Sequence, residues 1–391
     1  MKNKEILYVS PSIFPSKSAN SVHVINQCQA LAKYNKTVLV CGRSLLRKSD
    51  MKREIETAYG AIHKNLEIVS SYTLSSRGLA VVITFIALFR LLYFKRKYVL
   101  ISRNLYFSAI MMCFKRDAIY ETHLVEFGLR GLLQKMLLES SSTKCVVISN
   151  ALKDILLQKY PNSKGSINVL HDAANTSENR QAKIKDNQSY SNNKDFWSTK
   201  VNCKMEDYDH IIGYFGHLYK GRGVESIILP AAAQMPNTFF VIVGGNETDV
   251  ELHKPNAPFN VHFFGHQPHT HVLEAMKHCD VLLMPYQTEV SIGIPQHDTS
   301  KWMSPLKMFE YMSSGRPIIS SDLPVLREVL DDERNALMAD PKDYGAWVRS
   351  IERLVNDRVL GENIANRAMS DIDNIYNWSN RAKALMNLLK D

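Results

Sequence analysis

The sequence predicts an α/β protein with two parallel sheets, one in each half of the chain. Short apolar strands alternate with helical patterns, which is typical of strand–helix–strand units. A stretch rich in Asn, Ser, Lys and Asp interrupts this alternation at about 175–207, and the pattern then restarts. The length of 391 residues suffices for about two or three domains. We therefore expect two domains separated by a polar segment.

In the first half, apolar runs predict strands that alternate with two clear helices. Ser21 is expected to cap the first helix, over Ser21–Tyr34. A second helix is expected over Ala151–Tyr160. The predicted strands are Glu5–Ser10, Thr37–Cys41, Tyr98–Ser102, Ala118–Tyr120, Cys145–Ser149 and Ile167–Leu170.

Leu79–Phe94 is an apolar run that allows two interpretations. A membrane-spanning helix needs about 20 apolar residues, and this run is shorter and contains Arg90. The first interpretation is a helix buried in an α/β domain. The alternative is a helix on an anionic membrane surface, reached through residues 77–103, because no acidic residue lies between Glu67 and Asp117. Cations in that interval are Arg77, Arg90, Lys95, Arg96, Lys97, Arg103, Lys115 and Arg116.

The polar segment at 176–207 is predicted to be a linker or surface insertion, because it has few apolar residues. A loop inside one domain is disfavoured, since structureless loops of this length are uncommon. The predicted strands after it are Ile211–Phe215, Phe239–Val243, Val261–Phe264, Val281–Pro285 and Pro317–Ser320. Helices are expected over Tyr344–Val355, Gly361–Ala368 and Ser379–Leu389.

The stretch Ser304–Asp322 indicates a loop, a short helix, a glycine stop and a buried strand. Ser304 suits the cap, Pro305 the first helical position and Gly315 the end. A helix start presents free N–H groups and a positive dipole end, which can hold a phosphate. Glu310, two turns into the helix, can bind a pair of sugar hydroxyls. The stretch therefore predicts a nucleotide-sugar site.

Composition limits the partners and the compartment. The net charge of +9 favours anionic partners such as phosphate-rich substrates, nucleic acid or acidic membranes. No nucleic-acid recognition motif is found, so we expect no nucleic-acid partner. The scattered cysteines and the lack of a signal-peptide pattern predict a cytoplasmic protein, peripheral on the inner membrane face in the alternative above. No metal-ligand spacing occurs, and the histidines at 262–271 are interpreted as surface or cleft residues.

Several motifs occur in an order that resembles glycosyltransferase family 4, the retaining nucleotide-sugar transferases of the GT-B fold. The resemblance covers nearly the whole chain. It implies two Rossmann-like domains with parallel sheets facing a central cleft: an acceptor domain over 1–175, completed by a C-terminal helix at about 374–391, and a donor domain over 208–373. The motifs are Pro11–Val24, Ile148–Leu152, Val169–Ala173, Gly213–Val224, Val241–Gly245, Phe264–Gly265, Asp280–Tyr286 and Ser304–Asp322.

The resemblance implies roles for residues in the second half. Glu310 matches the second of the family's two glutamates, which holds the nucleotide ribose in relatives. Trp302 stands where relatives carry the first glutamate, which contacts the donor sugar. Lys307 is the candidate for a replacement charge near the phosphates or the donor sugar. The alternative is that Lys307 is a solvated lysine at the start of the helix. The motif Gly213–Val224 resembles the phosphate-binding motif of the family. Within it, Arg222 is the strongest candidate for bidentate contacts to the diphosphate. Further donor-site candidates are Gly216, His217, Lys220, Ser304, Pro305 and Leu306.

In the first half, His123 matches a histidine that faces the cleft in relatives. We expect it to orient or deprotonate an acceptor hydroxyl, with a pKa near working pH; a core histidine is the alternative. Asn20 and Ser21 are expected to donate backbone N–H groups to the β-phosphate.

Together these features predict a retaining glycosyltransferase that moves a sugar from a nucleotide-diphosphate sugar to a saccharide or lipid-linked acceptor. The acceptor class suggests surface polysaccharide assembly (capsule or O-antigen). We expect no metal and no other cofactor, because cations and amides would stabilise the leaving diphosphate. Two alternatives stay open: a sugar-nucleotide 2-epimerase, and a non-catalytic partner subunit, which the Trp302 departure favours.

Overall fold

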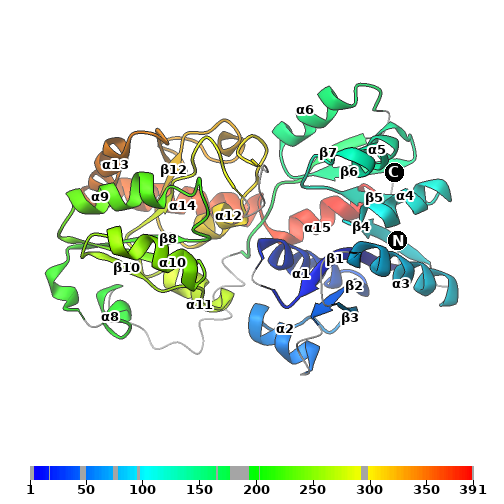
Figure 1. Ribbon diagram of the computed structural model, residues 1–391, viewed down its shortest axis with the longest axis horizontal. Helices are drawn as coiled ribbons and strands as arrows, with labels where there is room; N and C mark the ends of the chain where they lie inside the picture. Colours follow the sequence, from blue (N-terminus) through cyan, green and yellow to red (C-terminus); the bar gives the residue numbers. More distant parts are fainter. Residues whose placement is uncertain are drawn as a thin grey trace. The chain divides into compact units, whose positions relative to one another are not determined.

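A computed structural model describes residues 4–16, 18–44, 50–73, 78–94, 97–163, 166–176, 193–201, 203–291 and 298–389. The chain divides into two compact units (Figure 1). Unit 1 comprises Met1–Asp172 and Trp378–Asp391, and unit 2 comprises Ala173–Asn377. Each unit contains one all-parallel sheet with helices on its faces, which confirms the predicted α/β class.

The sheet of unit 1 has seven strands in the order β3-β2-β1-β4-β5-β6-β7. The chain starts in the middle and moves to one edge, then returns past the start, so the order reverses between β1 and β4. All six predicted strands are present, and β3 was missed. The strands are β1 (Glu5–Phe14), β2 (Thr37–Ser44), β3 (Leu66–Thr73), β4 (Tyr98–Ser102), β5 (Ala118–Glu121), β6 (Thr143–Val147) and β7 (Ser166–Val169).

The apolar helix at Leu79–Tyr93, α3, covers one face of this sheet. Leu79, Ile83 and Ala87 recur at helical spacing and pack against Leu7, Val38 and other strand residues. The helix is thus part of the α/β domain, as the first interpretation expected, but it is buried on one side only. The other helices of unit 1 are α1 (Ala19–Ala32), α2 (Met51–Tyr59), α4 (Leu105–Cys113), α5 (Gly128–Glu139), α6 (Asn150–Lys159) and α15 (Trp378–Asn387).

The start of α1 differs from the prediction. The N-cap is Ser18, whose side chain accepts from the Ser21 amide, so Ser21 lies inside the helix rather than capping it. Ser18 and Ser21 are equally good capping residues by type, and the chain uses the earlier one. The Ser21 N–H also lies 3.0 Å from the Ser18 carbonyl oxygen.

The sheet of unit 2 has six strands in the order β10-β9-β8-β11-β12-β13, the same winding as unit 1. The five predicted strands are present, and the short β13 was missed. The strands are β8 (His210–Phe215), β9 (Thr238–Val243), β10 (Val261–Phe263), β11 (Val281–Met284), β12 (Ile318–Ser321) and β13 (Leu337–Ala339). The order reverses between β8 and β11, and ligands of such sheets bind at the carboxyl ends of the strands beside this point.

Helices on one face of this sheet enclose the main core of unit 2. Ile227 and Ile228 from the π-helical turn η2 (Val224–Ile228) meet Trp347 and Ile351 over the strands. The helices of unit 2 are α8 (Asn193–Ser198), α9 (Leu229–Gln234), α10 (Glu247–His253), α11 (His269–Met276), α12 (Leu306–Ser313), α13 (Tyr344–Asn356) and α14 (Arg358–Asn374), with short 3₁₀ turns at Met205–Asp207, Lys254–Asn256 and Leu326–Glu328.

Part of the predicted linker is folded. Residues 177–192 lie outside the described residues, but α8 follows them and buries Phe196 and Trp197. The Trp197 indole N–H donates to the carbonyl of His278 at 2.7 Å. Two adjacent aromatic residues anchor this end of the segment to unit 2, despite its polar composition.

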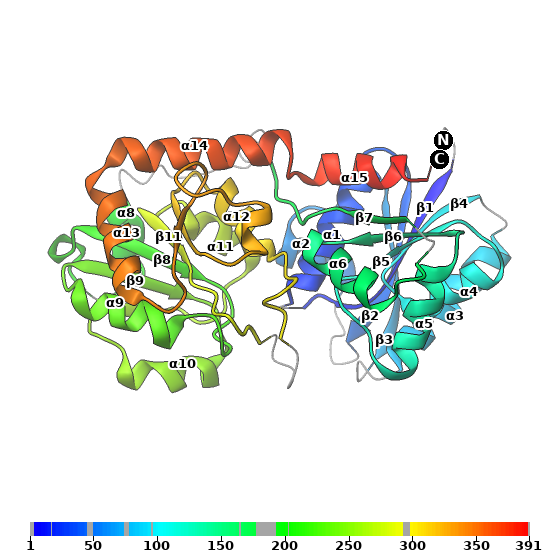
Figure 2. The same cartoon turned by 90° about the horizontal axis from the view of Figure 1, so that it is seen from above.

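The chain returns to unit 1 at its C-terminal end. α14 belongs to unit 2 and α15 to unit 1, and only a few residues separate them (Figure 2). α14 is longer than the predicted Gly361–Ala368. In the described part of the chain, no helix combines the length and apolarity that crossing a membrane requires.

Candidate functional site

In unit 2, the candidate site lies at the carboxyl ends of β8 and β11. The loop after β8 runs close to the segment after β11, and two glycines permit this approach. At Gly221 (φ +85°) a Cβ would lie 1.9 Å from the Glu289 carbonyl oxygen, and at Gly223 (φ +75°) 2.1 Å from that of Pro285. Any side chain at either position would therefore push the loop away.

Two cations meet on one aromatic platform in this loop region. The Lys307 ammonium lies 4.2 Å from the ring centroid of Tyr214 and 4.7 Å from that of Tyr286, and the Arg222 guanidinium lies 4.9 Å from Tyr286. Arg222 Nη2 donates to the Ser291 carbonyl at 3.1 Å, while its Nε is buried without a hydrogen-bond partner. Lys307 is thus held among aromatic rings, and the solvated-lysine alternative is wrong.

The electrostatics of this cluster favour an anion. Burial lowers the pKa of Lys307 well below its usual range, and Arg222 lowers it further, whereas Glu310 opposes the shift. Burial, Arg222 and Lys307 also lower the pKa of His217 to about 4. Burial and the charge of Arg222 thus both disfavour the ammonium form of Lys307, and an incoming anion would favour that form again.

The helix α12 begins one residue later than predicted. Pro305 occupies the N-cap and makes no side-chain cap, and Ser304 lies before it. The first-turn N–H groups therefore donate to no N-cap side chain, as an anion site requires. The Tyr311 hydroxyl accepts from the Phe215 amide at 2.7 Å, which ties α12 to the end of β8.

Glu310 has a partner that the sequence did not indicate. His269 Nε2 lies 2.6 Å from Glu310 Oε1, and both side chains are largely buried. His269 is the first residue of α11, and this contact adds it to the candidate site residues. Trp302 and Gly216 also lie in this unit, and a Cβ on Gly216 would come 3.1 Å from Lys307 Nζ. Lys220 is exposed, and its backbone carbonyl accepts from Ser291.

In unit 1, His123 follows β5 and contacts a buried carboxylate. His123 Nε2 lies 3.2 Å from Glu121 Oε1. Burial and then the charge of Arg103 lower the pKa of His123 to about 3. The expectation of a pKa near working pH is therefore wrong, because the chain buries this ring beside a cation. His123 is neutral at physiological pH, with Nε2–H donating to Glu121.

Behind His123 lies a buried network of charged side chains. His23 Nδ1 is 2.6 Å from Asp172 Oδ1 and His23 Nε2 is 2.9 Å from Glu121 Oε1, so both nitrogens face carboxylates. Arg381, from α15, donates to Glu121 Oε1 at 2.9 Å. It also donates to Gln27 at 2.6 Å, and the Tyr8 hydroxyl donates to Glu121 Oε2 at 2.9 Å.

Arg381 and His23 stabilise the ionised form of the two carboxyl groups in this network. Burial alone would raise the pKa of Glu121, but Arg381 and His23 hold it well below its usual range. Burial likewise opposes ionisation of Asp172, yet His23 lowers its pKa to about 2. Both carboxylates are therefore ionised in the folded chain, with Arg381 and the His23 ring as their close partners.

His23, Glu121 and His123 also meet the spacing of a metal site, with ligand atoms within 4.8 Å of one another. Arg381 lies on the same Glu121 oxygen that would bind the ion, and its fixed positive charge opposes a cation there. The donor set therefore fits a hydrogen-bonded network better than a metal centre.

Of the two first-loop residues, Ser21 does not offer the expected backbone amide. The Ser21 N–H is used by Ser18, so it is not available to a phosphate, which corrects the prediction for Ser21. The Asn20 side-chain amide donates to Ser12 Oγ at 2.7 Å, and Asn20 itself is exposed.

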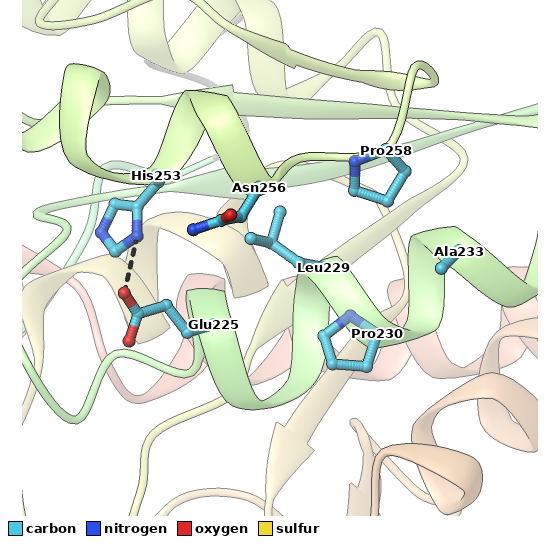
Figure 3. A pocket seen from close by; sticks show the side chains of 7 residues that line it. All are labelled: Glu225, Leu229, Pro230, Ala233, His253, Asn256 and Pro258. Atoms are coloured by element: carbon cyan, nitrogen blue, oxygen red, sulfur yellow. Dashed lines mark ion pairs between the residues drawn. The ribbon is translucent and has the colours of Figure 1, made fainter.

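A shallow pocket of unit 2 contains none of the predicted site residues (Figure 3). His253 and Glu225 point toward one another across it, with Nδ1 and Oε1 3.2 Å apart. Its other lining residues are mostly apolar, and it lacks the cation cluster described above. Its lining is Glu225, Leu229, Pro230, Ala233, His253, Asn256 and Pro258.

Comparison with known proteins agrees with this fold. Solved structures align with essentially the whole chain. Anabaena HepE, in complex with UDP and glucose, superposes with a TM-score of 0.69 at 13% identity, covering 100% of both chains. Sucrose-phosphate synthase from Thermosynechococcus elongatus gives 0.68 at 15% identity, covering 99% of this chain and 98% of the other. WaaG, a glycosyltransferase involved in lipopolysaccharide biosynthesis, superposes with a TM-score of 0.66 at 13% identity, covering 99% of this chain and 100% of WaaG.

The fold is GT-B. Within this GT-B protein, residues 209–357 match the family model described as glycosyl transferases group 1. A curated relative, an uncharacterized glycosyltransferase of Methanocaldococcus jannaschii, is 25% identical over 204 residues, which are 50% of this chain and 49% of the relative. The chain thus spans about half the length of the curated relative it matches. The matched family region contains Arg222, Lys307, Glu310 and His269.

Proposed function

We propose that this GT-B protein transfers a glycosyl group from a nucleoside-diphosphate sugar to a hydroxyl of a saccharide or lipid-linked acceptor. The observation that carries the proposal is the pair of cations Arg222 and Lys307, which lie on Tyr286 beside the uncapped start of α12. The group 1 match supports it, as does a structural neighbour that binds UDP and glucose.

The chemistry follows from where charge develops. The anomeric C–O bond to the diphosphate breaks, and negative charge grows on the leaving oxygen. Arg222, a Lys307 ammonium and the first N–H groups of α12 would stabilise that charge without a metal. Glu310, positioned by His269, would hold the ribose hydroxyls. We further propose retention of configuration, by attack on the same face with assistance from the leaving phosphate.

Unit 1 would bind the acceptor, with His123 as the group that meets its hydroxyl. Because His123 donates Nε2–H to Glu121, its Nδ1 lone pair can accept a hydrogen bond from that hydroxyl. An imidazole with a pKa of about 3 is a weak base, so orientation rather than full deprotonation is its role. The departing diphosphate is then the better proton acceptor.

The transferase assignment is tested by incubating the full chain with UDP-glucose and other nucleotide sugars. Donor binding is measured by calorimetry. Release of the nucleotide is then measured with and without an acceptor saccharide. Release that depends on the acceptor supports a transferase. Interconversion of the donor sugar without acceptor would establish the epimerase alternative, and no nucleotide binding at all would favour the partner-subunit alternative.

A membrane-proximal role in surface polysaccharide assembly is the finer part of the proposal. The outer side of α3 exposes large apolar side chains: Phe85 is 66% exposed, Phe89 63% and Leu92 77%. The exposed cations Lys97, Lys115 and Arg116 also belong to unit 1, whereas Arg77, Lys95 and Arg96 lie outside the described residues. Apolar side chains with basic flanks suit the inner, cytoplasmic face of an anionic membrane.

The membrane proposal is tested by sedimentation with vesicles containing anionic phospholipid at low and high salt. We expect binding that weakens with salt and is lost in Phe85→Ser/Phe89→Ser. The control is Leu252→Ser, which changes an exposed apolar residue of unit 2 that is 66% exposed. Equal sedimentation of all three proteins would contradict a membrane role for α3.

A further inference from the structure

Arg103 occupies the position in unit 1 where a parallel sheet of this order binds ligands. It directly follows β4, and its backbone N–H donates to the Val9 carbonyl of β1 at 2.9 Å. The strand order reverses between β1 and β4, so Arg103 stands at the reversal point, at the carboxyl end of the sheet. In the register of the sheet, Val9 pairs with Ser102, which places Ser10 of β1 next to Arg103.

The Arg103 guanidinium has no counter-charge among the described residues. Its Nη1 is buried and makes no hydrogen bond, and no described carboxylate forms an ion pair with it. Glu121 and Asp172, which lie in the same unit, already have Arg381 and His23 as close partners. A partly buried, unpaired guanidinium is costly, because it loses water without gaining a partner. The Arg103 guanidinium therefore lacks a partner that an anion could supply.

His123 lies within electrostatic reach of this guanidinium. The positive charge of Arg103 is the second cause, after burial, of the lowered pKa of His123. The two residues follow neighbouring parallel strands, because Ser102 of β4 pairs with Tyr120 of β5. One cation without a partner and one neutral imidazole with an open Nδ1 thus come together at one sheet edge.

We propose that Arg103, beside His123, binds an anionic group of the acceptor, either a phosphate or a carboxylate. This inference rests on the proposed function, since it identifies the acceptor class of the same reaction. The anion would supply the missing counter-charge, and guanidinium groups bind both oxyanions in bidentate geometry. The acceptor hydroxyl would then reach His123 Nδ1, so that one ligand meets both groups.

The first test measures anion binding to unit 1 in the full chain. The experiment uses a protein with Arg222→Gln and Lys307→Met, which removes the two cations of the candidate diphosphate site in unit 2. Inorganic phosphate, pyrophosphate and glucuronate are then titrated into this protein, and binding is followed by NMR of labelled histidine and arginine side chains. We expect one of these anions to shift the His123 and Arg103 signals. Adding Arg103→Gln should weaken that binding at least tenfold, and Arg103→Lys should weaken it less. The matched control Arg53→Gln removes an exposed cation of α2 and should leave binding unchanged.

The anions distinguish the sources. Binding of phosphate or pyrophosphate indicates a phosphorylated or lipid-diphosphate acceptor, and binding of glucuronate indicates an acidic sugar. Equal anion binding with and without Arg103→Gln would overturn the proposal, as would no binding of any of the three. If Arg103→Gln unfolds the chain, Arg103→Lys alone decides. Zn²⁺ binding that needs His23 and His123 and excludes phosphate would also overturn it.

The second test separates this inference from the proposed function. In transfer assays, Arg103→Gln should raise the KM for an anionic acceptor at least tenfold and leave the Kd for the nucleotide sugar unchanged. Arg103-dependent anion binding in a protein that binds no nucleotide sugar would sink the transferase assignment and keep the anion site. Transfer by Arg103→Gln with an unchanged KM for the anionic acceptor would keep the transferase assignment and overturn the anion site.

Discussion

The Nε2 atom of His269 lies 2.6 Å from the Glu310 carboxylate, although the two residues are 41 positions apart and on different helices. The contact fixes the direction of the Glu310 carboxylate before any ligand arrives. Because preorganised groups do not have to be ordered on binding, the pair is suited to hold ribose hydroxyls.

The first prediction concerns this pair. Glu310→Gln removes the charge that accepts from two hydroxyls, and hydrogen bonds to charged groups contribute about 1.5–3 kcal/mol, so donor affinity should fall about 10- to 100-fold. His269→Ala should have a smaller effect in the same direction. Calorimetry with UDP-glucose measures both. The control is His271→Ala, which changes a neighbouring histidine of α11 that has no role in this site and should bind UDP-glucose like the wild type. Unchanged donor affinity in Glu310→Gln would remove Glu310 from the site.

The second prediction concerns pH and Lys307. Burial and Arg222 lower the pKa of the free ammonium, and a bound diphosphate would raise it again. Binding therefore takes up a proton, and nucleoside-diphosphate affinity should decrease as pH rises above the lowered pKa of the free state. Lys307→Met should bind more weakly and lose this part of the pH dependence. Calorimetry in buffers of different ionisation enthalpy counts the protons; equal proton uptake in both proteins would argue against Lys307.

The third prediction separates the two cations of the phosphate loop. Arg222 is held over Tyr286, whereas Lys220 is exposed. Arg222→Ala should reduce diphosphate binding at least tenfold, and Lys220→Ala only a few-fold, since an exposed charge is screened by water and salt. Neither change should leave a buried carboxylate without its partner, because Lys220 is exposed and Arg222 pairs with no carboxylate in the described part of unit 2. A larger loss in Lys220→Ala than in Arg222→Ala would reverse the assignment.

The fourth prediction concerns stability and acid. Removing one partner of a buried ion pair costs about 3–5 kcal/mol, so Arg381→Met should strongly destabilise unit 1. The pKa values of Glu121 and Asp172 are lowered in the folded chain, that of Asp172 to about 2. Their contribution is complete above the unfolded pKa of about 4 and is lost as pH falls toward 2. Denaturant unfolding between pH 7 and 3 measures this. The control Arg367→Met changes an exposed arginine of α14; equal stability of the two variants would contradict a structural role for the network.

Strands with continuous apolar runs were predictable from the sequence, because a sheet covered on both faces needs apolar side chains on both. The strand Leu66–Thr73 was missed because it ends in Ser70, Ser71 and Tyr72 and lies at the edge of its sheet, where polar side chains are tolerated. The fold of Asn193–Ser198 was missed because two aromatic residues anchor it inside a polar stretch. The capping site of α1 was placed at the wrong serine.

Residues that act through long-range contacts were not predictable. Arg381 reaches Glu121 across 260 positions, and nothing local to either residue indicates the pairing. The low pKa of His123 likewise depends on burial beside Arg103, which only the folded sheet creates. By contrast, Arg222, Lys307 and Glu310 stand in motifs whose glycines and helix signals are local, and the structure brings Arg222 and Lys307 onto one tyrosine ring.

The central claim is that Arg222, Lys307 and the start of α12 bind a nucleoside diphosphate. Calorimetric titration of UDP and UDP-glucose into wild type, Arg222→Ala and Lys307→Met tests it most directly. We expect saturable binding by the wild type at one site and at least tenfold weaker binding by each variant. Equal affinity in all three proteins, or the absence of nucleotide binding by a folded wild type, would contradict it.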